Sequence, residues 1–332
     1  MSVDDTTRLT TALGDGITQM RLPMAGNPLG WINAYLLKDD GGYTLVDCGW
    51  RAGDVLAALN EGLAQCGTSL ADVRRLWITH VHFDHYGLAG TLRRAGLAEL
   101  IIHRLDWNHA RAHFGDPAAM DRIADAWIER NGLHADASID ETMQHNRTEV
   151  TEPTVVAEDD LQIGRLRAIW TPGHTPGHLC LLDTRSGRML TGDHVLDPIT
   201  PHVGVWGPDR GDPLGAYVNS LRKVAAIGAA TVLPAHGEPF SNLERRVSEL
   251  LDHHDVRERQ VLAALEAGPV SATGVARILP WTRRNRSFET LAELHQQFAV
   301  AETIAHLEHL RSRGVVTVDA SASPILYERD AR

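Results

Sequence analysis

The stretch His80-Val81-His82-Phe83-Asp84-His85 places three imidazoles and one carboxylate within six residues. It follows, after Thr79, an apolar run, Leu76-Trp77-Ile78, which is typical of a buried strand. A tight turn after a strand directs such side chains toward one point. The first two histidines can therefore reach one cation, and the carboxylate and the last histidine can reach a second cation nearby. We interpret this stretch as the centre of a metal site, and the competing interpretation is a histidine-rich surface turn.

Three further candidate ligands occur later in the chain. His174 lies in the Gly/Pro-rich segment Thr-Pro-Gly-His-Thr-Pro-Gly-His, Asp193 lies in Thr-Gly-Asp-His, and His236 lies in Pro-Ala-His-Gly. Each follows a strand-like run and occupies a turn, and loops at one edge of a rigid sheet often carry binding residues. Imidazoles and carboxylates without thiolates suit Zn²⁺, with Fe²⁺ and Mn²⁺ as alternatives.

These motifs, in this order, resemble those of the metallo-β-lactamase superfamily. The shared pattern is His-x-His-x-Asp-His, Thr-Pro-Gly-His-Thr-x-Gly-His, Gly-Asp and a late His-Gly, and it covers about residues 15–240. The resemblance implies an α/β fold, a four-layer αββα sandwich with a dinuclear site along one edge. It also implies two divalent metal ions as cofactors, with Zn²⁺ the first expectation.

The resemblance assigns a role to each matching position. It implies ligands to the first ion (His80, His82, His174), ligands to the second (Asp84, His85, His236) and a carboxylate that bridges both (Asp193). Asp47 and His178 match positions that support the site without binding metal.

The pattern also favours one branch of the family. Position 193 is Asp, where many antibiotic-hydrolysing members have Cys, and position 82 is His, where redox di-iron members have Glu. His236 follows Asp193 by 43 positions, which leaves no room for the nuclease cassette of the nucleic-acid-processing branch. The sequence therefore favours hydrolysis and argues against a true β-lactamase.

Two segments extend beyond these motifs. We expect a metallo-β-lactamase-like domain over residues 1–250, with a helical insertion at about 104–148 that forms a lid or substrate wall, or else a structural excursion. Residues 251–332 predict three helices and a hairpin, a winged-helix-like module. This layout resembles the subgroup that includes lactamase-like protein 2 and hydroxyacylglutathione hydrolase-type members. The third helix is rich in glutamate, so a cleft wall or a homodimer contact is a better expectation than DNA binding.

Composition narrows the class of partner. The 332 residues have a formal net charge of −11, which argues against a surface built for nucleic acid and favours a small-molecule substrate. The chain has no apolar run of membrane-spanning length and no basic, apolar leader at its start, so we expect a cytoplasmic protein without a membrane segment. Its three cysteines are scattered, as in a reducing compartment.

The residues predict a hydrolase that uses a metal-bridging hydroxide on a thioester, ester or lactone. Asp84 would be both ligand and catalytic proton acceptor. Tyr86 could donate to an oxyanion or pack behind the site, and His202 could contact substrate or be an ordinary loop residue. A phosphodiesterase or endoribonuclease with the same site, and a metal-binding scaffold without turnover, remain alternatives.

Overall fold

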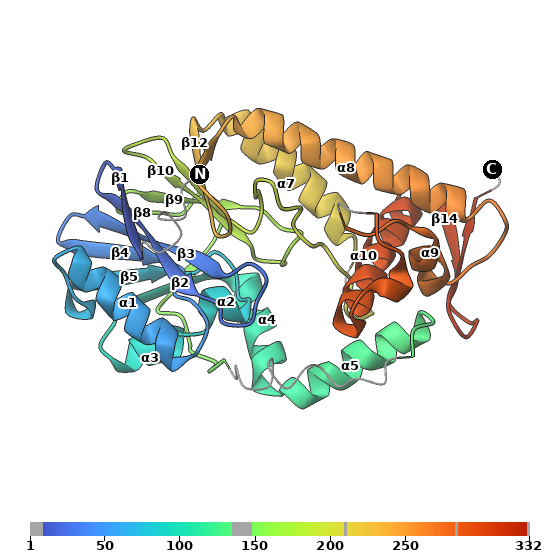
Figure 1. Ribbon diagram of the computed structural model, residues 1–332, viewed down its shortest axis with the longest axis horizontal. Coiled ribbons are helices and arrows are strands. Elements are labelled where there is room, and N and C mark those ends of the chain that lie inside the picture. Colours follow the sequence, from blue (N-terminus) through green and yellow to red (C-terminus); the bar gives the residue numbers. More distant parts are fainter. Residues whose placement is uncertain (1–8, 135–147, 209–210, 283–284, 331–332) are drawn as a thin grey trace.

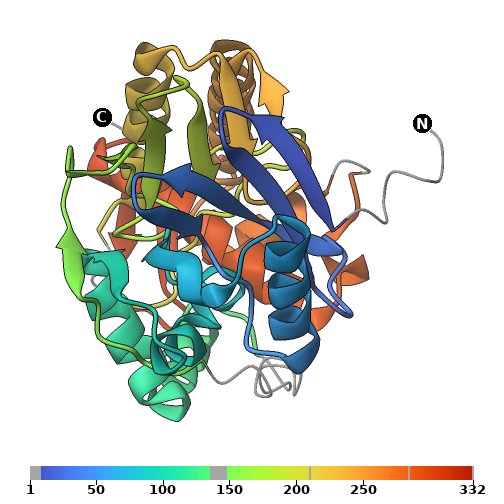
Figure 2. The same cartoon turned by 90° about the vertical axis from the view of Figure 1, so that its left-hand side faces the viewer.

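The computed structural model describes residues 9–134, 148–208, 211–282 and 285–330. Two β-sheets lie face to face, and helices cover the outer face of each sheet (Figure 1, Figure 2). This arrangement confirms the expected four-layer αββα sandwich.

The first sheet has seven strands in sequence order. They are β1 (Thr10–Gly14), β2 (Ile17–Pro23), β3 (Trp31–Asp39), β4 (Gly42–Val46), β5 (Val73–Trp77), β6 (Glu99–His103) and β7 (Val155–Ala157). Strands β1 to β4 pair antiparallel, whereas β4 to β7 pair parallel. The carboxyl ends of the parallel strands therefore meet at one edge of the sheet.

The second sheet has six strands in the order β13-β12-β11-β10-β9-β8. They are β8 (Gln162–Ile163), β9 (Leu166–Trp170), β10 (Leu179–Asp183), β11 (Met189–Gly192), β12 (Thr231–Pro234) and β13 (Phe240–Ser241). Strands β11 and β12 are parallel, and β9 runs in the same direction because β10 is antiparallel to both β9 and β11. These three strands also end at a common edge.

Alternation along β3 explains how the layers form. Tyr35 and Leu37 pack between the two sheets, whereas Ala34 and Leu36 pack with α1 (Gly53–Gln65) on the other face. Successive side chains of a strand point to opposite faces, so one apolar strand contributes to two cores. Helices α2 (Phe83–Tyr86) and α3 (Ala89–Arg94) belong to the same outer layer as α1.

The second sheet is covered by α7 (Pro213–Ile227) and α8 (Leu243–Ala264). The expected boundary at residue 250 falls within α8, which begins at Leu243 and continues without a break to Ala264. Its sequence contains neither Gly nor Pro, so nothing interrupts its backbone hydrogen bonds. The division of the chain at residue 250 stays a prediction.

The C-terminal segment continues with α9 (Ala272–Ile278), a 3₁₀ turn (Phe288–Thr290) and α10 (Glu293–Ser312), followed by the hairpin of β14 (Val316–Asp319) and β15 (Leu326–Arg329). The expected helices and hairpin are therefore present, while their assignment to a winged helix stays a prediction. The insertion contains α4 (Arg104–Gly115) and α5 (Pro117–Arg130), and its residues 135–147 lie outside the described part of the chain.

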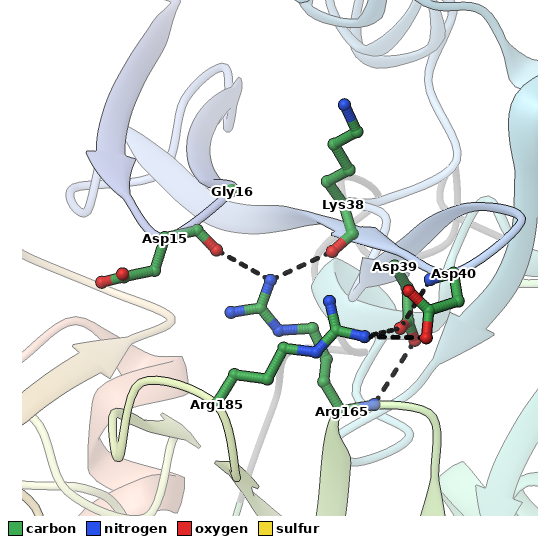
Figure 3. A pocket seen from close by; sticks show the side chains of 7 residues that line it. All are labelled: Asp15, Gly16, Lys38, Asp39, Asp40, Arg165 and Arg185. Atoms are coloured by element: carbon green, nitrogen blue, oxygen red, sulfur yellow. Dashed lines mark hydrogen bonds and ion pairs between the residues drawn. The ribbon is translucent and has the colours of Figure 1, made fainter.

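The edge of the sandwich opposite the strand ends is closed by a buried ion pair. The Arg165 guanidinium donates to both carboxylate oxygens of Asp183 at 2.7 and 2.5 Å, and to the carbonyls of Asp15 and Lys38 at 2.8 and 3.0 Å. Figure 3 shows this arginine beside a pocket at which strands of both sheets meet. Arg165 therefore connects the sheets through groups that satisfy one another.

Among the described residues, no helix is both long enough and apolar enough to span a bilayer.

Candidate metal centre

The predicted ligands converge at the edge where the parallel strands end. The His80–His85 stretch follows β5, His174 follows β9, Asp193 follows β11, and His236 follows β12. These strands come from both sheets and point the same way, so their following loops meet across the top of the sandwich. The structure brings all seven predicted ligand residues together.

Three imidazoles form the first group. His80 Nε2 lies 3.0 Å from His82 Nδ1, and His174 Nε2 lies 3.2 and 3.0 Å from these two nitrogens. The pKa of each of the three side chains lies below its usual value. Burial is the largest cause, and neighbouring histidines lower the pKa as well. Neutral imidazoles offer lone pairs, and three ring nitrogens at this spacing suit one cation with Zn–N bonds of about 2.0–2.1 Å.

The second group contains a carboxylate and two imidazoles. Asp84 Oδ2 lies 3.3 Å from His236 Nε2 and 3.7 Å from His85 Nε2. Burial alone would lower the pKa of both histidines, but nearby carboxylates outweigh burial and raise it. This half of the site therefore attracts a positive charge, whether a proton or a metal ion.

Asp193 lies between the two groups. Its Oδ1 is 3.6 Å from His85 Nε2 and 3.5 Å from His236 Nε2, while its Oδ2 is 3.8 Å from His174 Nε2. One carboxylate oxygen thus faces each group, which is the geometry of a bridging ligand.

Two buried polar atoms test whether metal ions fit here. His85 Nε2 and Asp193 Oδ1 have no hydrogen-bond partner. A buried polar atom without a partner is costly, and such atoms need an explanation. Both face the other ligand atoms, so a cation between them would satisfy both. The donor set and its geometry therefore fit a pair of divalent ions.

The nitrogens on the outer side of the ligand rings are held by other residues. Asp47 follows β4 and accepts from His85 Nδ1 at 2.8 Å, and it also accepts from the backbone and hydroxyl of Thr79 at 2.8 Å. Such partners fix the tautomer and orientation of a ligand imidazole. Asp47 thus lies beside His85, a predicted ligand, and outside the groups of predicted ligand atoms.

Backbone carbonyls hold two more of these rings. His174 Nδ1 donates to the carbonyl of His202 at 2.7 Å, and His236 Nδ1 donates to the carbonyl of Trp31 at 3.3 Å. The remaining nitrogen of each ring points into the site. The Trp31 carbonyl was not expected from the sequence, because a backbone acceptor leaves no signal in residue type.

His178 supports Asp193 through the backbone. Its Nε2 accepts from the Asp193 N–H at 3.2 Å, and its Nδ1 lies 2.9 Å from the hydroxyl of Thr171. His178 is fully buried, and burial holds its pKa well below the usual value. It therefore contacts the loop of the bridging carboxylate, in keeping with the supporting position expected for it.

Tyr86 and His202, which were considered as substrate contacts, form hydrogen bonds to other parts of the chain. The Tyr86 hydroxyl donates to the Thr151 carbonyl at 2.9 Å and accepts from the Thr151 N–H at 2.7 Å, so it serves this loop and not an oxyanion. His202 donates from Nε2 to the carbonyl of Phe298 on α10 at 3.2 Å. Its ring is therefore turned toward the C-terminal segment, and its contribution to the site is its carbonyl.

Asp106 is a buried carboxylate beside the site that we did not expect. It accepts hydrogen bonds from Val81, Thr175 and Gly177, and burial raises its pKa to about 6. A signal existed, because Asp106 follows β6, which is parallel to β5 and ends at the same edge.

Comparison with known proteins agrees with this geometry. The probable metallo-hydrolase YqjP of Bacillus subtilis is 26% identical over 300 residues, which cover 87% of this chain and 90% of that protein. The crystal structure of a metallo-beta-lactamase family protein from Thermus thermophilus has 31% identity and a TM-score of 0.81, covering 96% of this chain and 100% of the other. A beta-lactamase domain protein from Burkholderia ambifaria has 29% identity and a TM-score of 0.80, covering 97% and 93%.

The family model described as the metallo-beta-lactamase superfamily matches residues 29–236. That span contains every predicted ligand and most of both sheets. Members of this superfamily are metal-dependent hydrolases. Fold, ligand geometry and sequence agree, and the chain belongs to the metallo-beta-lactamase superfamily.

Proposed function

We propose that this chain is a dinuclear metal-dependent hydrolase that acts on a small-molecule thioester, ester or lactone. The observation that carries the proposal is that two groups of ligand atoms share the carboxylate of Asp193. When bound, two divalent ions supply Lewis acidity and lower the pKa of water toward neutrality. The donor set suits Zn²⁺ and also accepts Fe²⁺ or Mn²⁺.

The residues of the chain orient the reaction. Asp84 is the proton acceptor in this proposal. Burial acts to raise its pKa, but His85 and His236 outweigh burial and lower it, so the carboxylate is ionised at neutral pH. It can therefore take a proton from attacking water and return it to the leaving group. Asp47 and His178 keep His85 and Asp193 in place during this transfer.

Several observations favour a carbonyl substrate over a phosphodiester. The net charge of −11 disfavours a polyanion. The described residues between Asp193 and His236 form loops, α7 and β12, with no added domain. We include the insertion and the C-terminal segment as walls of the substrate site. Ile128 of α5 shares a core with α10, and His202 donates to Phe298, so both segments are fixed near the strand ends.

The test begins with metal analysis of the purified full-length chain. Hydrolysis is then measured on acyl-CoA and glutathione thioesters, lactones, bis-p-nitrophenyl phosphate and short RNA, before and after removal of metal by a chelator. We expect about two metal ions per chain and chelator-sensitive turnover of one or more carbonyl substrates. Turnover of the phosphate substrates alone would contradict the proposed substrate class, and a chain that binds no metal would contradict the site.

A further inference from the structure

Asp106 links the two loops that carry the first ligand group. It lies in the first turn of α4, and its side chain is fully buried. Its Oδ2 accepts from the Val81 N–H at 3.0 Å and from the Thr175 hydroxyl at 2.8 Å, while its Oδ1 accepts from the Gly177 N–H at 2.5 Å. Val81 lies between His80 and His82 in sequence, and Thr175 directly follows His174. One carboxylate therefore joins loops whose ligands are 94 residues apart.

The close approach of Gly177 to α4 is a second sign that this junction is built. A Cβ added at Gly177 would lie 2.4 Å from the backbone nitrogen of Asp106 and 2.7 Å from His103 Nδ1. The ring of His103 stacks on Trp170, at the end of β9, with ring centroids 5.5 Å apart. The start of α4 is thus fixed against the loop that carries His174.

The chemistry of the contact requires a carboxylate. The donors approach both oxygens, and an ionised carboxylate accepts on each of them. An amide accepts on its oxygen only, and its NH₂ group would face either Gly177 N–H or the Val81 and Thr175 donors. Asparagine therefore leaves at least one of the three donors facing its NH₂ group, so it cannot keep all three contacts.

We propose that Asp106 is a positioning residue that holds His80, His82 and His174 in the arrangement of a cation site. It contacts no ligand atom, and it acts on the metal through the loops. The proposal rests on the proposed function only in requiring that this centre binds metal. It gives the insertion a defined task, because α4 carries the residue that connects the two halves of the ligand group.

The test compares Asp106→Asn with Asp183→Asn in the full-length chain. Both substitutions turn a buried carboxylate with several donors into an amide, but Asp183 lies at the opposite edge, paired with Arg165. Zinc stoichiometry and affinity are measured by competition with a chromophoric chelator, and thermal unfolding is followed in parallel. We expect Asp106→Asn to weaken one of two zinc ions by about 10- to 100-fold, the effect typical of removing the partner of a ligand. Asp183→Asn should lower the unfolding midpoint and leave both zinc affinities unchanged.

Two further variants identify the site and guard against misfolding. In an Asp84→Ala background, where the second group is impaired, Asp106→Asn should remove the remaining tight zinc. Gly177→Ala keeps the carboxylate but pushes the loop away from α4, so it should weaken binding of the same zinc ion. It provides the test if Asp106→Asn does not fold.

Two zinc ions bound equally tightly by wild type, Asp106→Asn and Gly177→Ala would overturn the positioning role while leaving the proposed hydrolase intact. Equal loss of zinc affinity in Asp106→Asn and Asp183→Asn would overturn it as well, because the effect would then be general destabilisation. A wild-type chain that binds no zinc, iron or manganese would overturn the proposed function itself.

Discussion

The two edges of the sandwich both bury charged side chains, but the hydrogen bonding of these side chains differs between the edges. At one edge, Arg165 and Asp183 satisfy each other and the nearby carbonyls. At the other edge, His85 Nε2 and Asp193 Oδ1 are buried without a hydrogen-bond partner. Groups that satisfy one another stabilise the fold, whereas groups left facing a common point are available to a ligand. The contrast separates a structural charge cluster from a binding centre within one molecule.

The largest expected effect is that of Asp84→Ala at the strand-end edge. Loss of a ligand that is also the proton acceptor should reduce kcat/KM by about 10³-fold or more, with fewer metal ions bound per chain. Steady-state kinetics and metal analysis measure both effects. Asp183→Asn is the control at the opposite edge, and its kcat/KM at 25 °C should stay near that of wild type. Full activity in Asp84→Ala would remove the proposed mechanism.

Arg165→Ala should have the opposite effect to Asp84→Ala, with lower stability but unchanged metal binding. Removing one partner of a buried ion pair leaves Asp183 uncompensated, so we expect the free energy of unfolding to fall by about 3–5 kcal/mol. Urea denaturation measures this loss. The fraction that remains folded should bind metal as wild type does. Replacing both Arg165 and Asp183 by Leu should recover much of the stability, and failure to do so would show that the carbonyl contacts dominate.

Added metal should stabilise the chain only through the strand-end edge. Free Zn²⁺ at about 100 times its Kd should raise the free energy of unfolding by about 2.7 kcal/mol for one site. His236→Ala should reduce this gain, whereas Arg165→Ala should keep it despite its lower starting stability. Thermal unfolding with and without a chelator gives both values. An equal gain in His236→Ala would mean that the stabilising zinc binds elsewhere.

The smallest expected effect is a change in the stability of the chain at acid pH. Burial acts to raise the pKa of Asp183, but hydrogen bonds from Arg165 and Ser186, together with the charge of Arg165, outweigh burial and lower it from its usual 3.8. The ionised carboxylate therefore contributes stability above about pH 3.8, and that stability is lost as the pH falls through the lower folded-state pKa. Asp183→Asn cannot titrate, so the difference in stability between it and wild type should shrink in this acid range. A constant difference would assign the effect to packing.

Residue type and order predicted much of the binding centre. The seven predicted ligand residues stood in motifs after strand-like runs, and the structure brings their side chains together. Asp47 and His178 also lie beside ligands, as expected from their positions. Asp106 was missed although it follows β6 at the same edge, because its three hydrogen-bond partners lie far along the chain and such contacts leave no periodic pattern.

Contacts between residues far apart in the chain also explain other features that were not predicted. The Arg165–Asp183 pair connects two strands through a geometry that neither residue signals alone. Tyr86 looked able to reach the site because it adjoins His85, but its hydroxyl points to Thr151, a contact fixed by the path of the chain after the insertion. The continuity of α8 across residue 250 could have been predicted, since the absence of Gly and Pro over 243–264 was visible in the sequence.

The continuous course of α8 has a consequence for how the chain unfolds. Val247 and Val261 lie on either side of residue 250, and both belong to one apolar cluster with Met189 of the second sheet and Ile304 of α10. Truncation at residue 250 would cut this helix and uncover its apolar stripe, so the shorter product should aggregate. A fluorescent probe on α10 should report the same denaturation midpoint as one on β11, and metal bound at the strand ends should shift both probes together.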